Sequence, residues 1–209
     1  MPAVCTTSPA RGTTAAVTID ATGRIAAPGF IDPHTHTYDG LPNLDSTRRV
    51  NASSLMQGIR EAGDVGVASF NMTEADIATV MRDPWVMTNS DGSAGHPRLY
   101  GTHPRKIRRY VIEDRVITMA RMIQASSAQV AATYGIRDRG VLRASAFADV
   151  VLFDPATIRD EATDIEPTML ATGVRWVFVN GAPAVRNGSV TGLLAGRGLR
   201  RDTLLVRPR

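Results

Sequence analysis

The sequence is poor in cysteine, lysine and aromatic residues, and it has no long hydrophobic run. Cys5 alone cannot build an internal disulfide framework or a cysteine metal cluster, which favours a reducing compartment. No apolar run approaches the length that spans a bilayer, so we expect no membrane partner. Residues 1–17 lack the basic start and apolar core of a secretory signal, although their arginine and hydroxyl residues leave a targeting peptide as an alternative. We therefore expect a cytoplasmic protein.

The positive charge does not by itself indicate a nucleic-acid partner. The formal net charge is +4 at pH 7, and Lys106 is the only lysine among 24 basic residues. Arginines concentrate in residues 96–110 and 196–209, without the pattern of interleaved aromatic residues that stacks bases. A solvated basic surface explains this charge better, and an arginine-rich codon bias would produce the same number. We expect no nucleic-acid partner.

The chain of 209 residues is long enough for one domain, or for one domain with a small appendage. Its first residues, 1–14, show no periodicity and are expected to be disordered. Patterns of alternating apolar residues and of turn residues predict strands over 15–20 and 29–34, joined by a turn at 21–24. Residues 40–52 look like a loop. After it we expect a helix over 53–63 and a strand over 65–70.

The middle and the end of the chain alternate between helical and strand patterns. A helix is predicted over 73–82 and an apolar strand over 84–92, with Asp91 at its end. Short loops between such elements indicate a parallel crossover, which places functional residues at the carboxyl ends of strands. Apolar spacing predicts helix over 105–134, ended by Gly135. Further predicted elements are strands at 148–155 and 174–181 and tight turns at Asn180-Gly181 and Asn187-Gly188.

Two histidines in "APGFIDPHTHTYDG" suggest a metal site. In an extended strand His34 and His36 would project from the same face, and imidazole is the commonest protein ligand of a transition metal. Asp32 would share that face and orient one ring as a hydrogen-bond acceptor. The alternative is a chance His-x-His in a loop. The Pro-Gly pair and the short apolar step before the histidines favour the metal site.

Several segments in this order resemble one known family. They are "PGFIDPHTH", "VMTNSDG" followed by "HPRLYGTHPR", and "DRGVLRASAFADVVLFDP" with "VRWVFVNGAPAVRNG". This arrangement resembles the amidohydrolase superfamily, and within it the N-acyl-D-amino-acid deacylases (D-aminoacylases), over residues 16–40 and 54–200. The resemblance implies an α/β fold, in which a metal-dependent (β/α) barrel lies beside a small β-sandwich built from both chain ends.

The resemblance also implies roles for individual residues. His34 and His36 match the family's histidine pair, and Asp91 matches an aspartate that contacts metal and carries protons, so the metal ligands are His34, His36 and Asp91 and the catalytic residue is Asp91. Zinc is the expected cofactor and an N-acyl amino acid the small-molecule partner. Arg98 is a candidate substrate-binding residue because its guanidinium matches a carboxylate, although an exposed arginine explains it equally well. His96 and His103 are either auxiliary ligands or pocket groups, or simply loop histidines.

The chain is too short for a complete barrel of that family. Residues 37–90 have room for two βα units, and they lack the lysine or cysteine and the two histidines that supply the family's middle ligands. We therefore expect a large internal deletion joined within about residues 40–54, an incomplete barrel and one zinc ion at most. The expected domains are a disordered N-terminus at 1–14, a β-sandwich subdomain from 15–26 and 138–200, a truncated barrel portion at 27–137 and a tail at 201–209.

Three functional interpretations stay open at this point. The first is a metal-dependent hydrolase of linear amide C–N bonds that removes the acyl group from N-acyl-D-amino acids. The second is a non-catalytic remnant or gene fragment of such a deacylase that binds at most a metal ion. The third is a chain that completes itself by pairing with another chain, because exposed sheet edges favour self-association.

Overall fold

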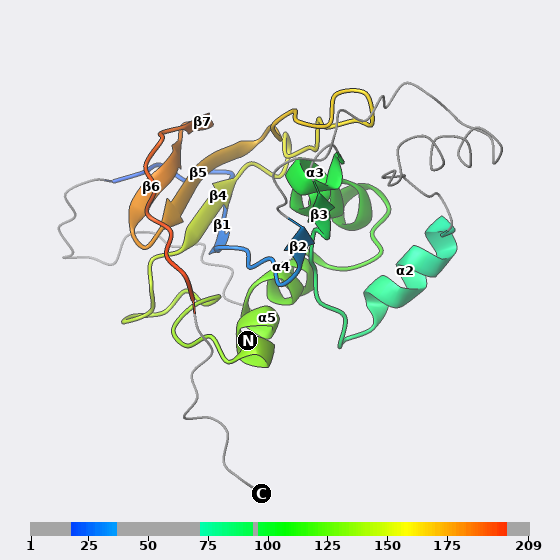
Figure 1. The fold of residues 1–209 in the computed structure, drawn as a ribbon, viewed down its shortest axis with the longest axis horizontal. Coiled ribbons are helices and arrows are strands. Elements are labelled where there is room, and N and C mark those ends of the chain that lie inside the picture. The colour runs from blue at the N-terminus through cyan, green and yellow to red at the C-terminus, as the bar shows by residue number, and fades with distance from the viewer. Residues whose placement is uncertain (1–17, 37–71, 94–95, 200–209) are drawn as a thin grey trace, which may run out of the picture.

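The computed structural model describes residues 18–36, 72–93 and 96–199, apart from the side chains of Thr35 and His36. Within these ranges a five-stranded antiparallel sheet lies beside a group of helices (Figure 1). Its order is β1-β4-β5-β6-β7, with bounds β1 (Ile25–Pro28), β4 (Val150–Phe153), β5 (Val174–Val179), β6 (Ala182–Arg186) and β7 (Ser189–Val190). The sheet therefore joins a strand from early in the chain to four strands near its end.

Local turn chemistry forms the two hairpins of this sheet. Asn180 and Gly181 both have positive φ, at 51° and 82°, and Asn187 and Gly188 have φ of 51° and 84°. Two successive residues with positive φ are the requirement of a type I′ turn, which Asn-Gly meets with little strain. The predicted turns and the predicted strands within 148–155 and 174–181 are confirmed.

Helices fill the middle of the described chain. Their bounds are α2 (Glu74–Arg82), α3 (Arg98–Arg105), η1 (Lys106–Glu113), α4 (Met119–Ser126) and α5 (Ala128–Tyr134). Thr73 begins α2 by accepting a hydrogen bond from the backbone of Asp76, and Gly135 ends α5 with φ of 66°, as predicted. Pro104, near the end of α3, lacks an N–H, and the chain then continues as the wider π-helical segment η1.

The strands predicted over 15–20, 29–34 and 84–92 differ from those in the structure. The described residues 18–20 and residues 29–34 contain no strand, whereas β1 lies between these two segments. Of residues 84–92 only Gly92 belongs to a strand, β3 (Gly92–Ser93). A run of apolar residues becomes a strand only where a neighbouring strand accepts its backbone hydrogen bonds. The turn at 21–24 is confirmed by a hydrogen bond of 3.0 Å from the Arg24 N–H to the Ala21 carbonyl. The elements predicted within 53–70 lie outside the described part of the structure.

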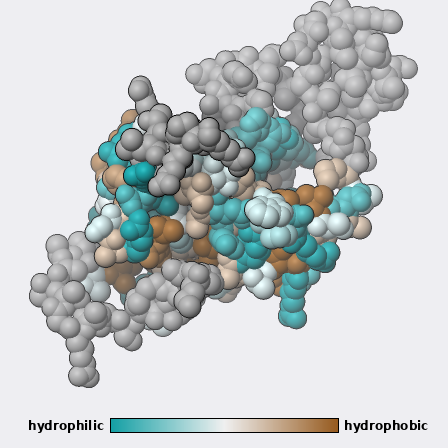
Figure 2. Space-filling view, turned by 90° about the horizontal axis from the view of Figure 1, so that it is seen from below, coloured by the Kyte–Doolittle hydropathy of each residue, from teal (hydrophilic) through white to brown (hydrophobic). Residues whose placement is uncertain are grey.

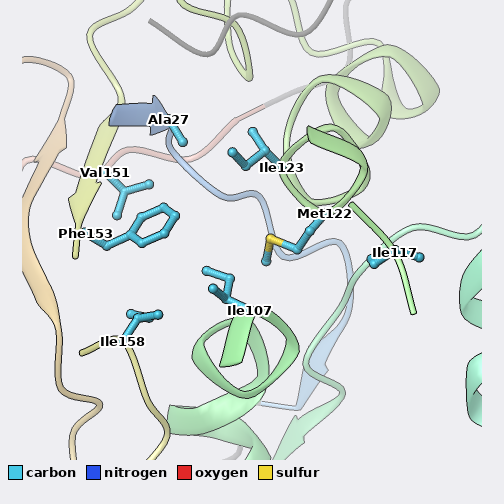
Figure 3. Close-up of a cluster of buried hydrophobic side chains, with 8 residues drawn as sticks. All are labelled: Ala27, Ile107, Ile117, Met122, Ile123, Val151, Phe153 and Ile158. Carbon is cyan, nitrogen blue, oxygen red and sulfur yellow. The ribbon is translucent and has the colours of Figure 1, made fainter. Parts of the chain in front are cut away.

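The hydrophobic core lies between the sheet and the helices (Figure 3). Val151 and Phe153 of β4 face Ile107 of η1 and Met122 of α4, and both Phe153 and Met122 have no exposed surface. Burying one such side chain contributes about 1.5–3 kcal/mol to folding. These contacts therefore hold the late strands and the helices of the middle segment together as one packed unit.

A buried polar chain lies among the same helices. The Lys106 ammonium donates a hydrogen bond of 2.7 Å to the Thr88 hydroxyl, and Ser126 donates one of 2.9 Å to that oxygen. Lys106 is only 8% exposed. Burial, together with the nearby Arg121 guanidinium, lowers the pKa of its ammonium from 10.5 to about 8. The segment before β3 is thus attached to the helices by polar contacts as well as apolar ones.

A second buried cation links the connection after α5 to the sheet. The Arg139 guanidinium forms a salt bridge with Asp149 and donates to the side-chain carbonyl of Asn180 in the β5–β6 turn. It also lies 4.1 Å from the ring centre of Phe147. Arg139 is 7% exposed, so these partners satisfy a charge that is almost fully removed from water.

The surface mixes polar and apolar side chains. On the face in Figure 2 the apolar residues form separate patches between hydrophilic ones. The most exposed large apolar side chains include Trp85, Ile165, Leu170 and Leu194. No helix in the described ranges has both the length and the apolar character needed to cross a membrane.

Candidate metal centre

Two short parallel strands bring distant segments of the chain together. β2 (Thr35–His36) pairs with β3 (Gly92–Ser93), with Thr35 opposite Gly92 and His36 opposite Ser93 (Figure 1). The Asp91 N–H also donates a hydrogen bond of 2.9 Å to the His34 carbonyl. The residues just before the two strands therefore lie side by side, although 57 positions apart in sequence numbering.

His34 and Asp91 are in direct contact. The His34 Nε2 atom lies 3.2 Å from one Asp91 carboxylate oxygen, and an Arg98 guanidinium nitrogen lies 3.1 Å from the other. The side chains of His34 and Asp91 are 58% and 43% exposed, so water and small molecules can reach both. The structure thus brings together three of the residues that the sequence singles out.

The backbone at Asp91 has an unusual conformation. Its φ is 45°, in the left-handed region that few residues with a side chain adopt. Gly92 follows, and a Cβ atom there would lie 2.6 Å from a Leu99 side-chain carbon and 3.1 Å from the Leu99 Cα. Glycine at this position therefore lets the chain pass close to α3, on which Arg98 is the first residue.

Among the described residues, the carboxylate of Asp32 contacts Ser90 and the backbone of His34. Its carboxylate accepts hydrogen bonds from the Ser90 N–H at 3.0 Å, from the Ser90 hydroxyl, and from the backbone N–H of His34 at 3.3 Å. Sequence reasoning missed Ser90 altogether. Its only signal was its place directly before the aspartate in "SDG", which also occurs in ordinary turns.

Arg98 lies at the site, where it contacts a carboxylate of the protein itself. The guanidinium contacts Asp91, so a substrate carboxylate would have to exchange with or share that contact. Its Nε atom is buried and makes no hydrogen bond to the described residues. His96 accepts a hydrogen bond of 3.1 Å from the Arg98 N–H, and burial lowers the pKa of its imidazole.

His103 lies in the protein interior. Its ring stacks on Phe30 with ring centres 5.0 Å apart, and its Nδ1 atom is buried without a hydrogen-bond partner among the described residues. Burial lowers its pKa from 6.5 to about 4. With Phe30 and Ile107 it lines an apolar cavity of about 420 Å³ between the sheet and the helices. The structure therefore gives His103 a contact with an aromatic ring rather than with Asp91.

The donor chemistry at His34 and Asp91 fits zinc, which is bound in proteins by imidazole nitrogens and carboxylate oxygens. The described side chains contain no group of three or more His, Cys, Asp or Glu residues placed to hold a metal ion. The side chain of His36, the third predicted ligand, lies outside the description, although its backbone pairs within β2. The described part of the site thus supplies two donors of the right kind.

Comparison with known proteins supports a common origin with amide hydrolases. The model of the family described as "Amidohydrolase family" matches residues 17–77 and 62–185. A D-aminoacylase of Alcaligenes xylosoxydans xylosoxydans is 36% identical over 163 residues, which are 76% of this chain and 34% of that one. The chain therefore spans about a third of the length of this relative.

Solved structures agree with the sequence match. One is a D-aminoacylase structure with a binuclear metal centre, reported with one-metal activation and second-metal attenuation. It matches with a TM-score of 0.60 and 36% identity, over 62% of this chain and 28% of the D-aminoacylase chain. N-acyl-D-glutamate deacylase from Bordetella bronchiseptica, complexed with zinc and a phosphonate inhibitor, has a TM-score of 0.54 at 39% identity, covering 58% and 28%. Since the family model matches most of its length, this chain belongs to the amidohydrolase family.

Proposed function

We propose that this protein is a metal-dependent hydrolase of linear amide C–N bonds that acts on N-acyl-D-amino acids. The observation that carries this proposal is the contact between His34 Nε2 and the Asp91 carboxylate, made by segments at the start of two adjacent parallel strands. The amidohydrolase family match and the deacylase relatives supply the reaction class. In this proposal His34, His36 and Asp91 hold one zinc ion.

Each residue has a separate task in the reaction. A zinc ion held by His34, His36 and Asp91 would supply Lewis acidity, which would lower the pKa of the attacking water to about 7 and polarise the amide carbonyl. Asp91 accepts the proton that the attacking water loses and delivers it to the departing amine nitrogen. Arg98 binds the substrate carboxylate through its planar guanidinium, and the release of its contact with Asp91 leaves that carboxylate available for proton transfer.

The same ancestry leads us to propose the domain arrangement predicted from the sequence. Residues 27–137 form the truncated barrel portion, and 15–26 with 138–200 form the β-sandwich subdomain, between an N-terminal segment at 1–14 and a tail at 201–209. The parallel pairing of β2 with β3 supports the first unit, since barrel strands are parallel. The antiparallel sheet that joins β1 to the late strands supports the second, although β1 continues to Pro28, two residues past the proposed boundary.

A second candidate function is metal binding without catalysis. It is favoured by the length of the chain, which spans about a third of a deacylase relative. A catalytic group displaced by about 1 Å can lose on the order of a hundredfold in rate. A chain that keeps His34 and Asp91 adjacent can therefore bind an ion and still fail to turn over substrate.

The deciding experiment measures zinc content and deacylase activity on the same folded sample. The proposal expects about one zinc per chain, as for a mononuclear catalytic site, and release of the free amino acid from N-acetyl-D-amino acids, both lost in Asp91→Asn. Asp83→Asn is the matched control, because Asp83 is an exposed aspartate that bonds the backbone N–H two residues on at 2.8 Å, away from the site. Zinc without turnover supports the second candidate, and a folded chain without zinc overturns both.

Self-association is a further expectation of this proposal. β1 and β7 are the outermost strands of the described sheet, so each has one edge without a strand neighbour in that sheet. Unpaired strand edges favour pairing with another chain. Light scattering on the purified protein distinguishes a monodisperse oligomer, which supports completion by a second chain, from a monomer, which contradicts it.

A further inference from the structure

Asp32 is hydrogen-bonded to both segments that carry the candidate zinc ligands. One carboxylate oxygen accepts from the His34 N–H at 3.3 Å and from the Ser90 N–H at 3.0 Å, and the other accepts from the Ser90 hydroxyl. Asp32 and Ser90 are 58 positions apart in the chain. A single side chain thus connects the residue before Asp91 to the backbone of His34.

Ser90 extends this connection into β3. Its hydroxyl oxygen accepts a hydrogen bond of 3.0 Å from the Gly92 N–H while its proton is donated to Asp32. Ser90 is 6% exposed, so water has little access to compete for these bonds. Asp91 lies between the two bonded residues, and its own N–H donates to the His34 carbonyl at 2.9 Å.

The positive φ of Asp91 shows why such support is needed. A residue with a Cβ atom disfavours the left-handed region, and it keeps that conformation only where surrounding contacts hold it there. The bonds on either side, at Ser90 and Gly92, fix the backbone at the two flanking residues. Without them the peptide would relax toward negative φ, and the direction of the Asp91 carboxylate relative to His34 would change.

We infer that Asp32 and Ser90 form a positioning device, the Asp32–Ser90 clamp, that holds the Asp91 carboxylate beside the His34 imidazole. Neither residue is a metal ligand or a catalytic residue in the proposed reaction. The inference rests on the proposed function for the statement that the two positioned side chains bind zinc. The clamp itself is a matter of hydrogen bonding and can be tested without metal.

The variants are chosen to remove the clamp in steps. Asp32→Ala removes all three bonds, Ser90→Ala removes those of the hydroxyl, and Asp32→Asn keeps an amide oxygen for the two backbone N–H groups. Asp83→Ala is the matched control, since Asp83 accepts the same type of bond from the N–H two residues on, that of Trp85, at a place away from the site. All are made in the full chain.

Three measurements are taken on each variant: hydrogen exchange at the Asp91 amide without metal, zinc affinity, and the urea midpoint of unfolding. We expect Asp32→Ala and Ser90→Ala to accelerate Asp91 exchange by about tenfold or more while exchange in β4 and β5 stays unchanged. Zinc affinity should fall about 10- to 100-fold, the usual effect of losing groups that orient ligands. Asp32→Asn should restore part of both losses, and Asp83→Ala should change neither.

The double variant Asp32→Ala/Ser90→Ala gives an independent criterion. If the residues act as one device, Ser90→Ala should weaken zinc binding much less in the Asp32→Ala background than alone. Unchanged Asp91 exchange in both single variants overturns the clamp. The clamp is also overturned if zinc affinity falls only in proportion to the loss of stability, measured as the urea midpoint of unfolding. If Asp91 exchange is accelerated in the variants but the wild-type protein binds no zinc, the clamp is supported and the proposed function is overturned.

Discussion

The buried Lys106 should make the stability of this protein rise with pH in the alkaline range. Its ammonium is 8% exposed, and burial lowers its pKa from 10.5 to about 8. Between these two values the unfolded chain binds a proton that the folded chain has released, so folding becomes more favourable as the pH increases. The stabilisation is absent below about pH 8 and complete above the pKa of the unfolded chain.

The size of the effect follows from the shift of the pKa. The difference between a pKa of 10.5 and one of about 8, at about 1.36 kcal/mol for each pH unit, corresponds to about 3 kcal/mol between the two plateaus. From about pH 7.5 to about pH 9.5 the expected gain in the free energy of unfolding is about 2 kcal/mol. This range stays below the titration of Tyr110, whose pKa is raised above its ordinary value by burial and by Glu74.

The perturbation that isolates this effect is Lys106→Met, which keeps an unbranched side chain and removes the charge. The variant loses the bond of 2.7 Å to Thr88, at a cost of about 1 kcal/mol, while Ser126 still donates to that hydroxyl. It should therefore be more stable than the wild type by about 2 kcal/mol near pH 7 and should lose the alkaline gain.

Urea unfolding of both proteins at the two pH values measures the midpoint and the slope. Because Lys106 is the only lysine, the pH dependence of acylation of its side-chain amine gives its pKa directly. Equal pH dependence of wild type and variant, or an amine that titrates near 10.5, would refute the reasoning.

Other parts of the structure give three further predictions. Gly173→Ala should destabilise the fold by roughly 2 kcal/mol or more, since Gly173 has φ of 80° and a Cβ would lie 2.4 Å from backbone atoms. Gly23→Ala, with φ of 72° but open space around the Cβ, should cost only about 1 kcal/mol. Equal urea midpoints for the two variants would contradict this. Arg139→Ala should cost about 3 kcal/mol in the same assay because it leaves Asp149 partly buried without its cation, and a loss below about 1 kcal/mol would show that the pair is unimportant. Stability should fall as the pH drops from 6.5 toward 4, because the unfolded chain takes up a proton that the buried His103 resists, and His103→Phe should reduce that fall.

The features that the sequence predicted well depend on neighbouring residues. The Asn180-Gly181 turn, the end of α5 at Gly135 and the beginning of α2 at Thr73 each depend on the conformational preference or hydrogen bond of one residue. Such signals are complete within a few positions of the chain. They carry no information about which distant segment packs against them.

The features that the sequence missed depend on distant partners. Residues 84–92 have the composition of a buried strand, but of these only Gly92, the first residue of β3, pairs with a neighbouring strand, the short β2. The hydrogen bonds from Ser90 to Asp32 join positions far apart in the chain, and no local pattern announces them. The contact of Arg98 with Asp91 was likewise invisible, because a guanidinium binds a protein carboxylate and a substrate carboxylate with the same geometry.

The pairing of β2 with β3 has a consequence for how this chain can be altered. The backbone bonds around His34 and Asp91 are made between residues 32–36 and 90–93 themselves, so they do not require any particular number of residues in the connection between the two segments. We therefore expect two polypeptides, produced by a cut within that connection, to be able to form the same bonds with each other. If the two pieces reassemble on mixing, β2 and β3 would then pair between separate molecules.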